Sequence, residues 1–270
     1  SVVEFELPAH ADDAAVAVAA AAAASDPANT MPELPTLKQL ALFCLPTLGI
    51  WLSSPLLSLI DTSVVGLTCA THHLAALAPS TKLCDYVAFF CSVMGAATTN
   101  LAADAFAHGD PTKAKRVIGG SLTISIGVGI IVAAVLGVLA RPLMAAMLGA
   151  SAAANPAMWT AASQYTTIRA LGYPAALMTM VLQSAFIATK DSRSPLLAVP
   201  LVAAVNLVAD LCLVPSMGAA GAAWATTLAL YTNAAALLGM WARKARTVAS
   251  RPVPVLAWPT KAETKALLAF

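Results

Sequence analysis

The chain has 270 residues, a formal net charge of +2, 59% hydrophobic residues and only 10% charged residues. A typical soluble domain carries about 25% charged residues, so this composition excludes an ordinary soluble protein and indicates an integral membrane protein. The nearly balanced charge provides no basic surface for a nucleic acid, so we expect the lipid bilayer and small solutes as partners.

Residues 1–35 differ from the rest of the chain. They hold an alanine-rich tract over 14–24, six acidic residues and no lysine or arginine. A transit peptide is rich in arginine and serine, and a secretory signal opens with positive charge, so this segment fits neither. We expect a mobile leader over 1–35, and a cleaved targeting sequence could have preceded Ser1.

Six segments of the remaining chain are long and apolar enough to cross a bilayer, whose core needs about 20 residues per helix. In chain order we expect them at 37–59, 83–106, 117–140, 165–189, 196–213 and 219–241. The predicted fold class is therefore an all-α integral membrane protein, with a six-transmembrane-helix lobe over 36–241. Residues 242–270 are expected to form a linker on the cytoplasmic side.

Lysines and arginines concentrate in alternate linkers: between the second and third segments, between the fourth and fifth, and after the sixth. The opposite side carries only Lys82 and Arg141. By the positive-inside rule, both ends of the six-helix unit face the cytoplasm or its organellar equivalent.

Three polar residues lie within these apolar segments: Asp61 near the end of the first, and Asn206 and Asp210 in the fifth. An acid at membrane depth costs at least about 2.5 kcal/mol, so it usually faces a protein-lined cavity and marks an ion or substrate path. Asn206 and Asp210 are four residues apart and share a helix face. They could bind Na⁺, Asp210 could carry a proton, or the pair could only fix helix packing. Asp61 is at membrane depth if its helix ends near Gly66, and interfacial if it ends near Leu59.

Other polar residues give weaker signals. Thr226 and Thr227 could add hydroxyl ligands or could bond only to their own helix. Arg169 could reach the outer surface or neutralise an acid. His72 and His73 share an outer loop without further ligands, so we expect no metal site. Because no nucleophile with a base can be assembled, we expect no catalytic residue, no cofactor other than a coupling ion, and no enzyme.

Small and bending residues also mark the segments. Glycines occur along the third segment and at the start of the sixth. They indicate close helix packing rather than substrate contact; they are Gly119, Gly120, Gly127, Gly129, Gly137, Gly218 and Gly221. Prolines inside the expected spans remove backbone hydrogen bonds and predict bends, as is common in transporters; they are Pro46, Pro55, Pro174 and Pro200.

The end of the first segment resembles the first helix and following loop of MATE (multidrug and toxic compound extrusion) transporters, through Pro55-Leu-Leu-Ser-Leu-Ile-Asp-Thr-Ser-Val-Val-Gly66 and Leu74-Ala-Ala-Leu-Ala. Further motifs agree in order and spacing; they are Thr99-Asn-Leu-Ala-Ala-Asp-Ala with Gly109-Asp, Ala203-Ala-Val-Asn-Leu-Val-Ala-Asp210, and Gly218-Ala-Ala-Gly-Ala-Ala-Trp-Ala-Thr226. The resemblance is closest to the plant-type branch, whose members include plastid-envelope exporters, so that membrane is a candidate location.

The resemblance implies an antiporter in which H⁺ or Na⁺ moving inward drives export of a small organic solute. Asp61 matches the first-helix aspartate of the family's cation site, Asn206 and Asp210 match its fifth-helix pair, and Thr226 is the best match for its sixth-helix threonine. Pro46 matches a first-helix proline whose bend is linked, in some members, to protonation. Neither the substrate nor the choice between H⁺ and Na⁺ follows from the sequence.

Family members contain two six-helix lobes in twelve helices, with the substrate cleft between them, whereas this sequence resembles one amino-terminal lobe. Because alternating access rocks one bundle against the other, we expect a second lobe, either in a longer chain beyond Phe270 or in a partner. Two alternatives remain. One is a flippase for a lipid-linked precursor, which would favour an arginine-lined cleft, and the other is a membrane adaptor that does not transport.

Overall fold

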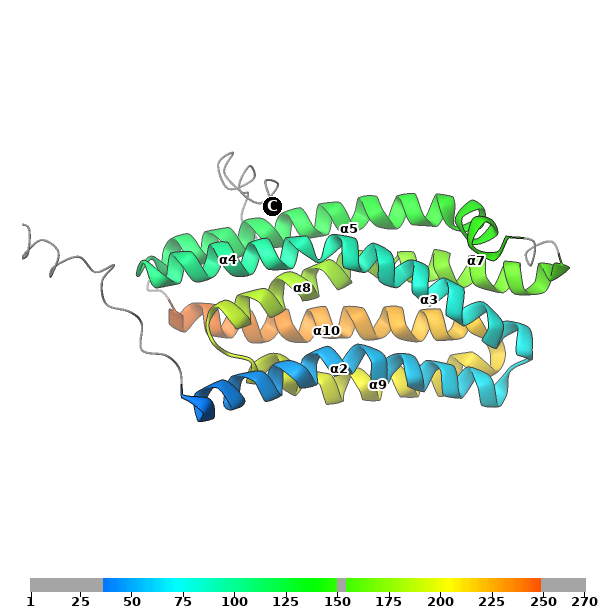
Figure 1. The fold of residues 1–270 in the computed structure, drawn as a ribbon, viewed down its shortest axis with the longest axis horizontal. Helices are drawn as coiled ribbons and strands as arrows, with labels where there is room; N and C mark the ends of the chain where they lie inside the picture. The colour runs from blue at the N-terminus through cyan, green and yellow to red at the C-terminus, as the bar shows by residue number, and fades with distance from the viewer. Residues whose placement is uncertain (1–35, 150–153, 249–270) are drawn as a thin grey trace, which may run out of the picture. The chain divides into compact units, whose positions relative to one another are not determined.

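A computed structural model describes residues 36–149 and 154–248, and apart from short connections these residues are helical (Figure 1). The helices are α2 (Leu37–Thr68), α3 (Thr71–Cys91), α4 (Val93–Ala107), α5 (Pro111–Leu148), α7 (Pro156–Ala170), α8 (Tyr173–Ala188), α9 (Arg193–Met217) and α10 (Ala219–Val248). Residues 1–41 form a unit of their own, in which the start of α2 is described, and the following paragraphs concern the unit that begins at Leu42. The expected leader over 1–35, and the expected linker beyond residue 248, lie outside the described residues.

Each expected span corresponds to helix, but the boundaries differ. The first span extends as α2 to Thr68, so Asp61 lies inside a helix rather than beyond its end. The second span is built from α3 and α4 and begins already at Thr71. Residues 242–248, expected to belong to the linker, continue α10. These helices are longer than predicted because they run past the apolar core into polar flanks, where hydropathy falls but backbone hydrogen bonding continues.

The fourth expected span is broken. Helix α7 ends at Ala170 and α8 begins at Tyr173, with a bend of 51° between them. Pro174 therefore lies in the first turn of α8, at the bend within this broken span, so the bend that the sequence predicted at this proline is confirmed. A proline is well tolerated there, because the missing backbone N–H would have no helical partner in the first turn. Pro46 and Pro55 in α2 and Pro200 in α9 do lie within helices.

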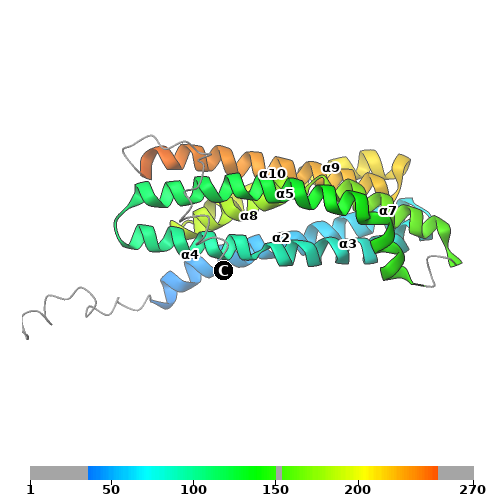
Figure 2. The same ribbon diagram turned by 90° about the horizontal axis from the view of Figure 1, so that it is seen from above.

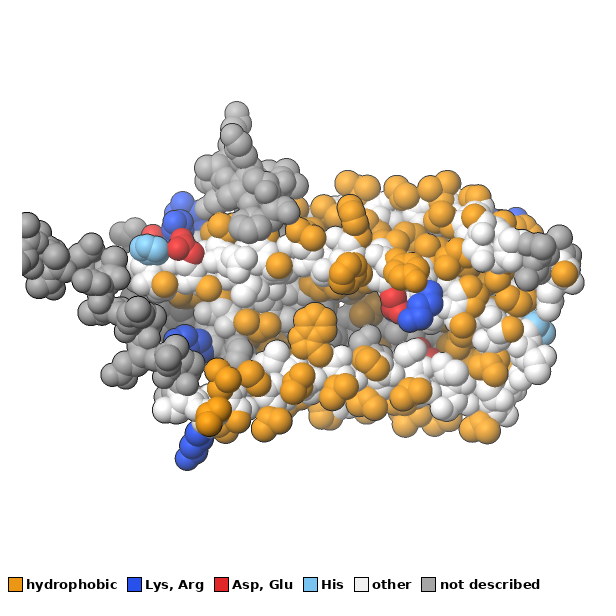
Figure 3. Space-filling model, in the orientation of Figure 1, with side chains coloured by type: hydrophobic (Ala, Val, Ile, Leu, Met, Phe, Trp, Pro, Cys, Tyr) orange, Lys and Arg blue, Asp and Glu red, His pale blue; other side chains and the backbone are white. Residues whose placement is uncertain are grey.

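Four of the described helical segments are long and apolar enough to cross a membrane, and the bent pair α7–α8 gives a fifth. Helix α10 has the length, at 30 residues, but is less apolar than the others. Its position explains this composition, because α10 packs against α7, α8 and α9 and so presents much of its surface to protein. Figure 3 shows that hydrophobic side chains dominate the visible face of the described helices, as expected for a surface in contact with lipid.

Helices α4 and α5 pack against each other and lie side by side in Figures 1 and 2. The chain reverses between them at Gly109, whose positive φ of 70° suits glycine. Asp110 then caps α5 by accepting a hydrogen bond of 2.8 Å from the backbone N–H of Lys113. This turn accounts for the Gly109-Asp motif seen in the sequence.

Some of the expected packing glycines do sit at close helix crossings. A Cβ atom on Gly129 of α5 would lie 2.5 Å from the backbone of Pro174 in α8, and one on Gly221 of α10 would lie 2.6 Å from the backbone of Leu213 in α9. The same prediction fails for Gly127 and Gly137, where a Cβ atom would meet nothing within 4 Å. A stripe of small residues covers more than one helix face, and only one of those faces touches a neighbour.

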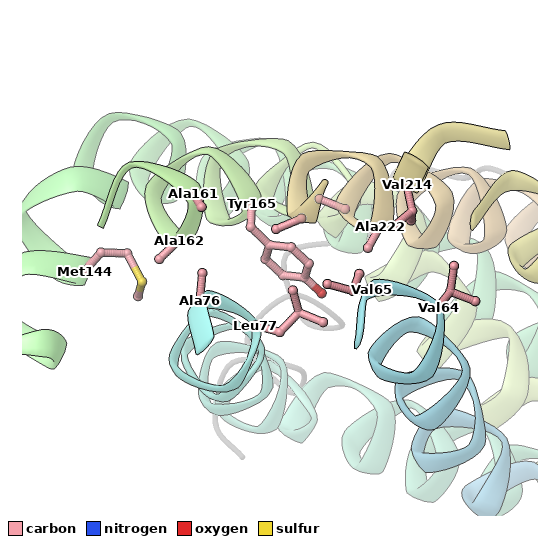
Figure 4. Packing of buried hydrophobic residues seen from close by; sticks show 12 residues of the cluster. Val64, Val65, Ala76, Leu77, Met144, Ala161, Ala162, Tyr165, Val214 and Ala222 are labelled. Atoms are coloured by element: carbon pink, nitrogen blue, oxygen red, sulfur yellow. The ribbon is translucent and has the colours of Figure 1, made fainter. Parts of the chain in front are cut away.

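One buried hydrophobic cluster joins α2, α3, α5, α7, α9 and α10 (Figure 4). Tyr165 of α7 lies at its centre, surrounded by small and branched side chains that include Val65 of α2, Leu77 of α3 and Ala222 of α10. The cluster therefore holds the carboxyl-terminal part of α2 against α9 and α10, next to the polar residues described below.

Candidate cation site

Asp61 points into the protein and not to lipid. Its side chain is 5% exposed, on the same stretch of α2 as the buried Val64 and Val65. Helix α2 continues past Gly66 to Thr68, which is the case in which the sequence predicted membrane depth for Asp61, and that depth stays a prediction. An acid so placed needs polar partners, because burying an unpaired charge is strongly unfavourable.

Asn206 and Asp210 of α9 supply the first of those partners. Both side chains are fully buried and lie one helical turn apart. The amide nitrogen of Asn206 donates a hydrogen bond of 2.6 Å to Oδ1 of Asp61 and another of 3.1 Å to Oδ2 of Asp210. An amide nitrogen carries two protons, so one neutral side chain holds both carboxyl groups.

Thr226 of α10 supplies the next partner. Its hydroxyl lies 2.9 Å from Oδ2 of Asp61 and 2.8 Å from the carbonyl oxygen of Ala222 in its own helix. A hydroxyl has one proton, so Thr226 donates a hydrogen bond either to Asp61 or to Ala222, and in the second case its oxygen can accept a hydrogen bond from a protonated, neutral Asp61. Thr227, in contrast, points elsewhere, with its hydroxyl 3.4 Å from the carbonyl of Ile168.

The four residues leave two buried oxygens without a hydrogen-bond partner, Oδ1 of Asp210 and Oδ1 of Asn206. Within the described chain, no ion pair links Asp61 or Asp210 to a lysine, arginine or histidine. Two buried acids, beside one spare carboxyl oxygen of Asp210 and one spare amide oxygen of Asn206, favour a positive charge, which a proton or a hard cation such as Na⁺ would supply. The geometry can hold either, and the cation-binding role of the four residues stays a prediction.

Other residues singled out in the sequence lie outside this cluster. Pro46 is on α2 about four turns before Asp61, where it is half-buried. Nε of Arg169 is buried without a hydrogen-bond partner, but this residue forms no ion pair with Asp61. Nδ1 of His73 accepts a hydrogen bond of 3.3 Å from the backbone N–H of Ala219 and so caps α10. No group of three metal-ligating side chains occurs among the described residues.

The sequence predicted a bend at Pro174, but not that the fourth span divides into two separate helices, α7 and α8. Helix α7 packs against α3 and α8 packs against α4, while both helices also pack against α5 and α10. The signal was present in Gly172-Tyr-Pro174, because glycine followed closely by proline commonly interrupts a helix.

A comparison with known protein families covers the part of the chain that holds most of these polar residues. The MatE family model matches residues 46–212, a stretch that includes Asp61, Asn206 and Asp210. The chain belongs to the MatE family. The predicted membership is confirmed, and the plant-type branch fits the relatives described next.

Among curated proteins, Protein DETOXIFICATION 47, chloroplastic, of Arabidopsis thaliana is 36% identical over 200 residues, which are 73% of this chain and 36% of that protein. DNA damage-inducible protein F of Escherichia coli (strain K12) is 27% identical over 191 residues, covering 70% of this chain and 40% of that protein. This MatE chain thus spans well under two thirds of the length of the curated relatives it matches.

Solved structures show the same fold. A MOP superfamily transporter from Pyrococcus furiosus superposes with a TM-score of 0.74 at 20% identity, over 86% of this chain and 50% of that one. A MATE structure in the straight conformation gives a TM-score of 0.72 at 20% identity, again over 86% and 50%. The all-α membrane fold, corresponding to one lobe of a MATE transporter, is therefore confirmed.

Proposed function

We propose that this chain supplies the cation-binding lobe of an antiporter that exports small organic solutes in exchange for H⁺ or Na⁺. One observation carries the proposal: Asp61 and Asp210 are buried, share the amide of Asn206, and form no ion pair with a lysine, arginine or histidine among the described residues. A purely structural role would be served better by apolar side chains, because buried acids are costly in a membrane.

The unpartnered oxygens suggest how the ion is held. A proton would sit on Asp210, whose Oδ1 has no hydrogen-bond donor, and would remove one of two neighbouring negative charges. Na⁺ would instead bind between Oδ1 of Asp210 and Oδ1 of Asn206, after small side-chain rotations that also engage Asp61. Both ions neutralise the same pair of acids, so the proposal covers either.

The cluster also offers a route from ion binding to helix movement. Helix α2 packs less extensively against the other helices than α9 and α10 do against each other, and its link to them includes the Asp61 hydrogen bonds. A change of charge at these acids alters those bonds, and Pro46 and Pro55 give α2 two points at which it can bend. The coupling ion would thus control the position of α2 against α9 and α10.

Transport requires a second lobe, which we place in a longer version of this chain or in a partner. The fit of this chain to half of each solved transporter supports this arrangement, and alternating access by rocking needs two bundles. The word "chloroplastic" in the name of the Arabidopsis relative supports the plastid envelope as the membrane.

The test is reconstitution of the two-lobe protein in vesicles loaded with a fluorescent organic dye. An imposed H⁺ or Na⁺ gradient should accelerate dye movement, and Asp210→Asn should abolish the acceleration at unchanged protein levels. The matched control is Asp104→Asn, which alters an exposed acid paired with His108. If neither gradient accelerated dye movement by a correctly inserted protein, the non-transporting adaptor would be favoured instead.

A further inference from the structure

A groove of about 270 Å³ lies between α5 and α7, and none of its lining residues belongs to the candidate cation site. Gly137, Val138 and Arg141 line it from α5, and Thr160 and Gln164 line it from α7. This groove combines an open apolar wall with a cationic rim, and its charge, depth and remaining donors indicate what it binds.

The positive charge at the rim is held in place. The guanidinium carbon of Arg141 lies 5.4 Å from the ring centroid of Trp159, and the indole N–H of Trp159 donates a 3.3 Å hydrogen bond to the carbonyl of Arg141. Arg141 is exposed and forms no ion pair with an acid in the part of the chain that the structure describes. The charge is therefore oriented but available to a ligand.

The position of the groove along α5 is the one expected for lipid headgroups. Helix α5 has 38 residues and is about 57 Å long, which exceeds a bilayer core of about 30 Å. Arg141 directly follows the apolar stretch over 117–140, and tryptophan is enriched where hydrocarbon meets water. One turn earlier, Val138 is 79% exposed, so an apolar surface that lipid tails would cover adjoins the charge.

The polar lining favours an anion. The hydroxyls of Thr160, Ser163 and Thr167 already donate to carbonyls of their own helix, at 2.8, 2.8 and 2.9 Å. The donors that remain toward the groove are the guanidinium of Arg141 and the side-chain amide of Gln164. Gly137 keeps the floor open, because even a Cβ atom there would meet nothing within 4 Å.

We propose that this groove binds the phosphate-bearing headgroup of an anionic bilayer lipid. Arg141 and Gln164 donate hydrogen bonds to the phosphate, and an acyl chain runs along Val138. A soluble phosphate would satisfy Arg141 but would leave the apolar wall uncovered, whereas a lipid satisfies both together.

Native mass spectrometry of the purified chain in detergent, titrated with phosphatidylglycerol or phosphatidylcholine, tests the proposal. We expect phosphatidylglycerol to be retained in preference to phosphatidylcholine, and Arg141→Gln to weaken its binding roughly tenfold. The matched control is Arg116→Gln, which removes an exposed arginine from the other end of the same helix and should leave the affinity unchanged.

A second variant separates the loss of charge from a loss of folding. Gly137→Leu fills the open floor while keeping Arg141, so it should weaken phosphatidylglycerol binding with little change in thermal unfolding. Equal affinities for Arg141→Gln and Arg116→Gln would overturn the proposal, as would equal retention of the two lipids. Displacement of the lipid by inorganic phosphate at matching concentration would overturn it in favour of a soluble-anion site.

Discussion

Asn206 of α9 donates a hydrogen bond of 2.6 Å to Asp61 of α2, a residue 145 positions away in the sequence. The same amide nitrogen reaches Asp210 at 3.1 Å, so the two acids are joined through one neutral group. Because the acids share this donor in a buried site, a proton or cation that arrives at one changes the charge felt by the other. The proposed ion binding would thus be a property of the cluster and not of a single residue.

Removing the shared amide should destabilise the protein. In Asn206→Ala two buried carboxyl groups lose their common donor, and we expect a loss of about 1–3 kcal/mol in the free energy of unfolding. Thermal unfolding in detergent, followed by circular dichroism, measures this. The matched control is Asn233→Ala, which truncates a half-buried asparagine on α10 and should lower the midpoint much less. Equal shifts of the unfolding midpoint in the two variants would mean that the hydrogen bonds from Asn206 to the two acids do not stabilise the protein.

The two neighbouring threonines of α10 should behave differently. Thr226→Val keeps the shape of the side chain but removes the hydroxyl 2.9 Å from Asp61, and we expect cation affinity to fall roughly tenfold. Thr227→Val removes a hydroxyl that faces Ile168 and should leave the affinity unchanged. Titration of the purified chain with Na⁺, and separately with acid, compares the pair. If both variants bound alike, Thr226 would be only a packing residue.

Two glycines of α5, only one of which lies close to α8, provide a second pair of variants to compare. Gly129→Ala places a methyl group 2.5 Å from the Pro174 backbone, so α5 must shift away from α8, and we expect a loss of about 1–3 kcal/mol. Gly127→Ala adds the same methyl group where nothing lies within 4 Å and should be neutral or slightly stabilising. The free energy of unfolding of both variants, measured by denaturant or thermal unfolding, tests this prediction. Comparable stability would contradict the close crossing at Gly129.

An ion pair at the expected cytoplasmic end should give a defined pH dependence. Lys244 of α10 contacts Asp191 at 2.7 Å, and Ser194 donates to the same carboxylate through its hydroxyl and backbone N–H. Burial acts to raise the pKa of Asp191, but these hydrogen bonds and the Lys244 charge outweigh it and lower that pKa below 3.8. Asp191→Asn should therefore cost about 1–2 kcal/mol at neutral pH.

This contribution is fully present above the ordinary pKa of 3.8 and is lost as the pH falls through the lower value of the folded protein. The stability difference between wild type and Asp191→Asn should accordingly shrink only in strong acid. Asp104→Asn, at an acid 57% exposed, is the control and should cost little at any pH. A difference for Asp191→Asn that stayed constant into strong acid would show that the charge of Asp191 is irrelevant.

Much of the fold could be predicted because its signals are local. Long apolar runs predict the membrane helices, and the four-residue spacing of Asn206 and Asp210 places both on one face of α9. The high cost of an acid in lipid also singled out Asp61 before its neighbours were known.

The rest depends on contacts that a linear pattern does not encode. The meeting of Asn206 with Asp61 requires α2 to lie beside α9, and the separation of Thr226 from Thr227 depends on how α10 is rotated. Hydropathy averages over about 20 residues, so a break of two residues between α7 and α8 leaves little trace in it. The groove at Arg141 likewise arises only where α5 and α7 diverge.

Cation binding by the purified chain tests the central claim most directly. Bound ²²Na⁺, and proton uptake after a pH jump, would be measured for wild type, Asp210→Asn and the control Asp104→Asn. We predict saturable binding of one of these ions to wild type and to Asp104→Asn, and its loss in Asp210→Asn. Binding that persisted unchanged in a folded Asp210→Asn variant would contradict the assignment of Asp61, Asn206, Asp210 and Thr226 as the cation site.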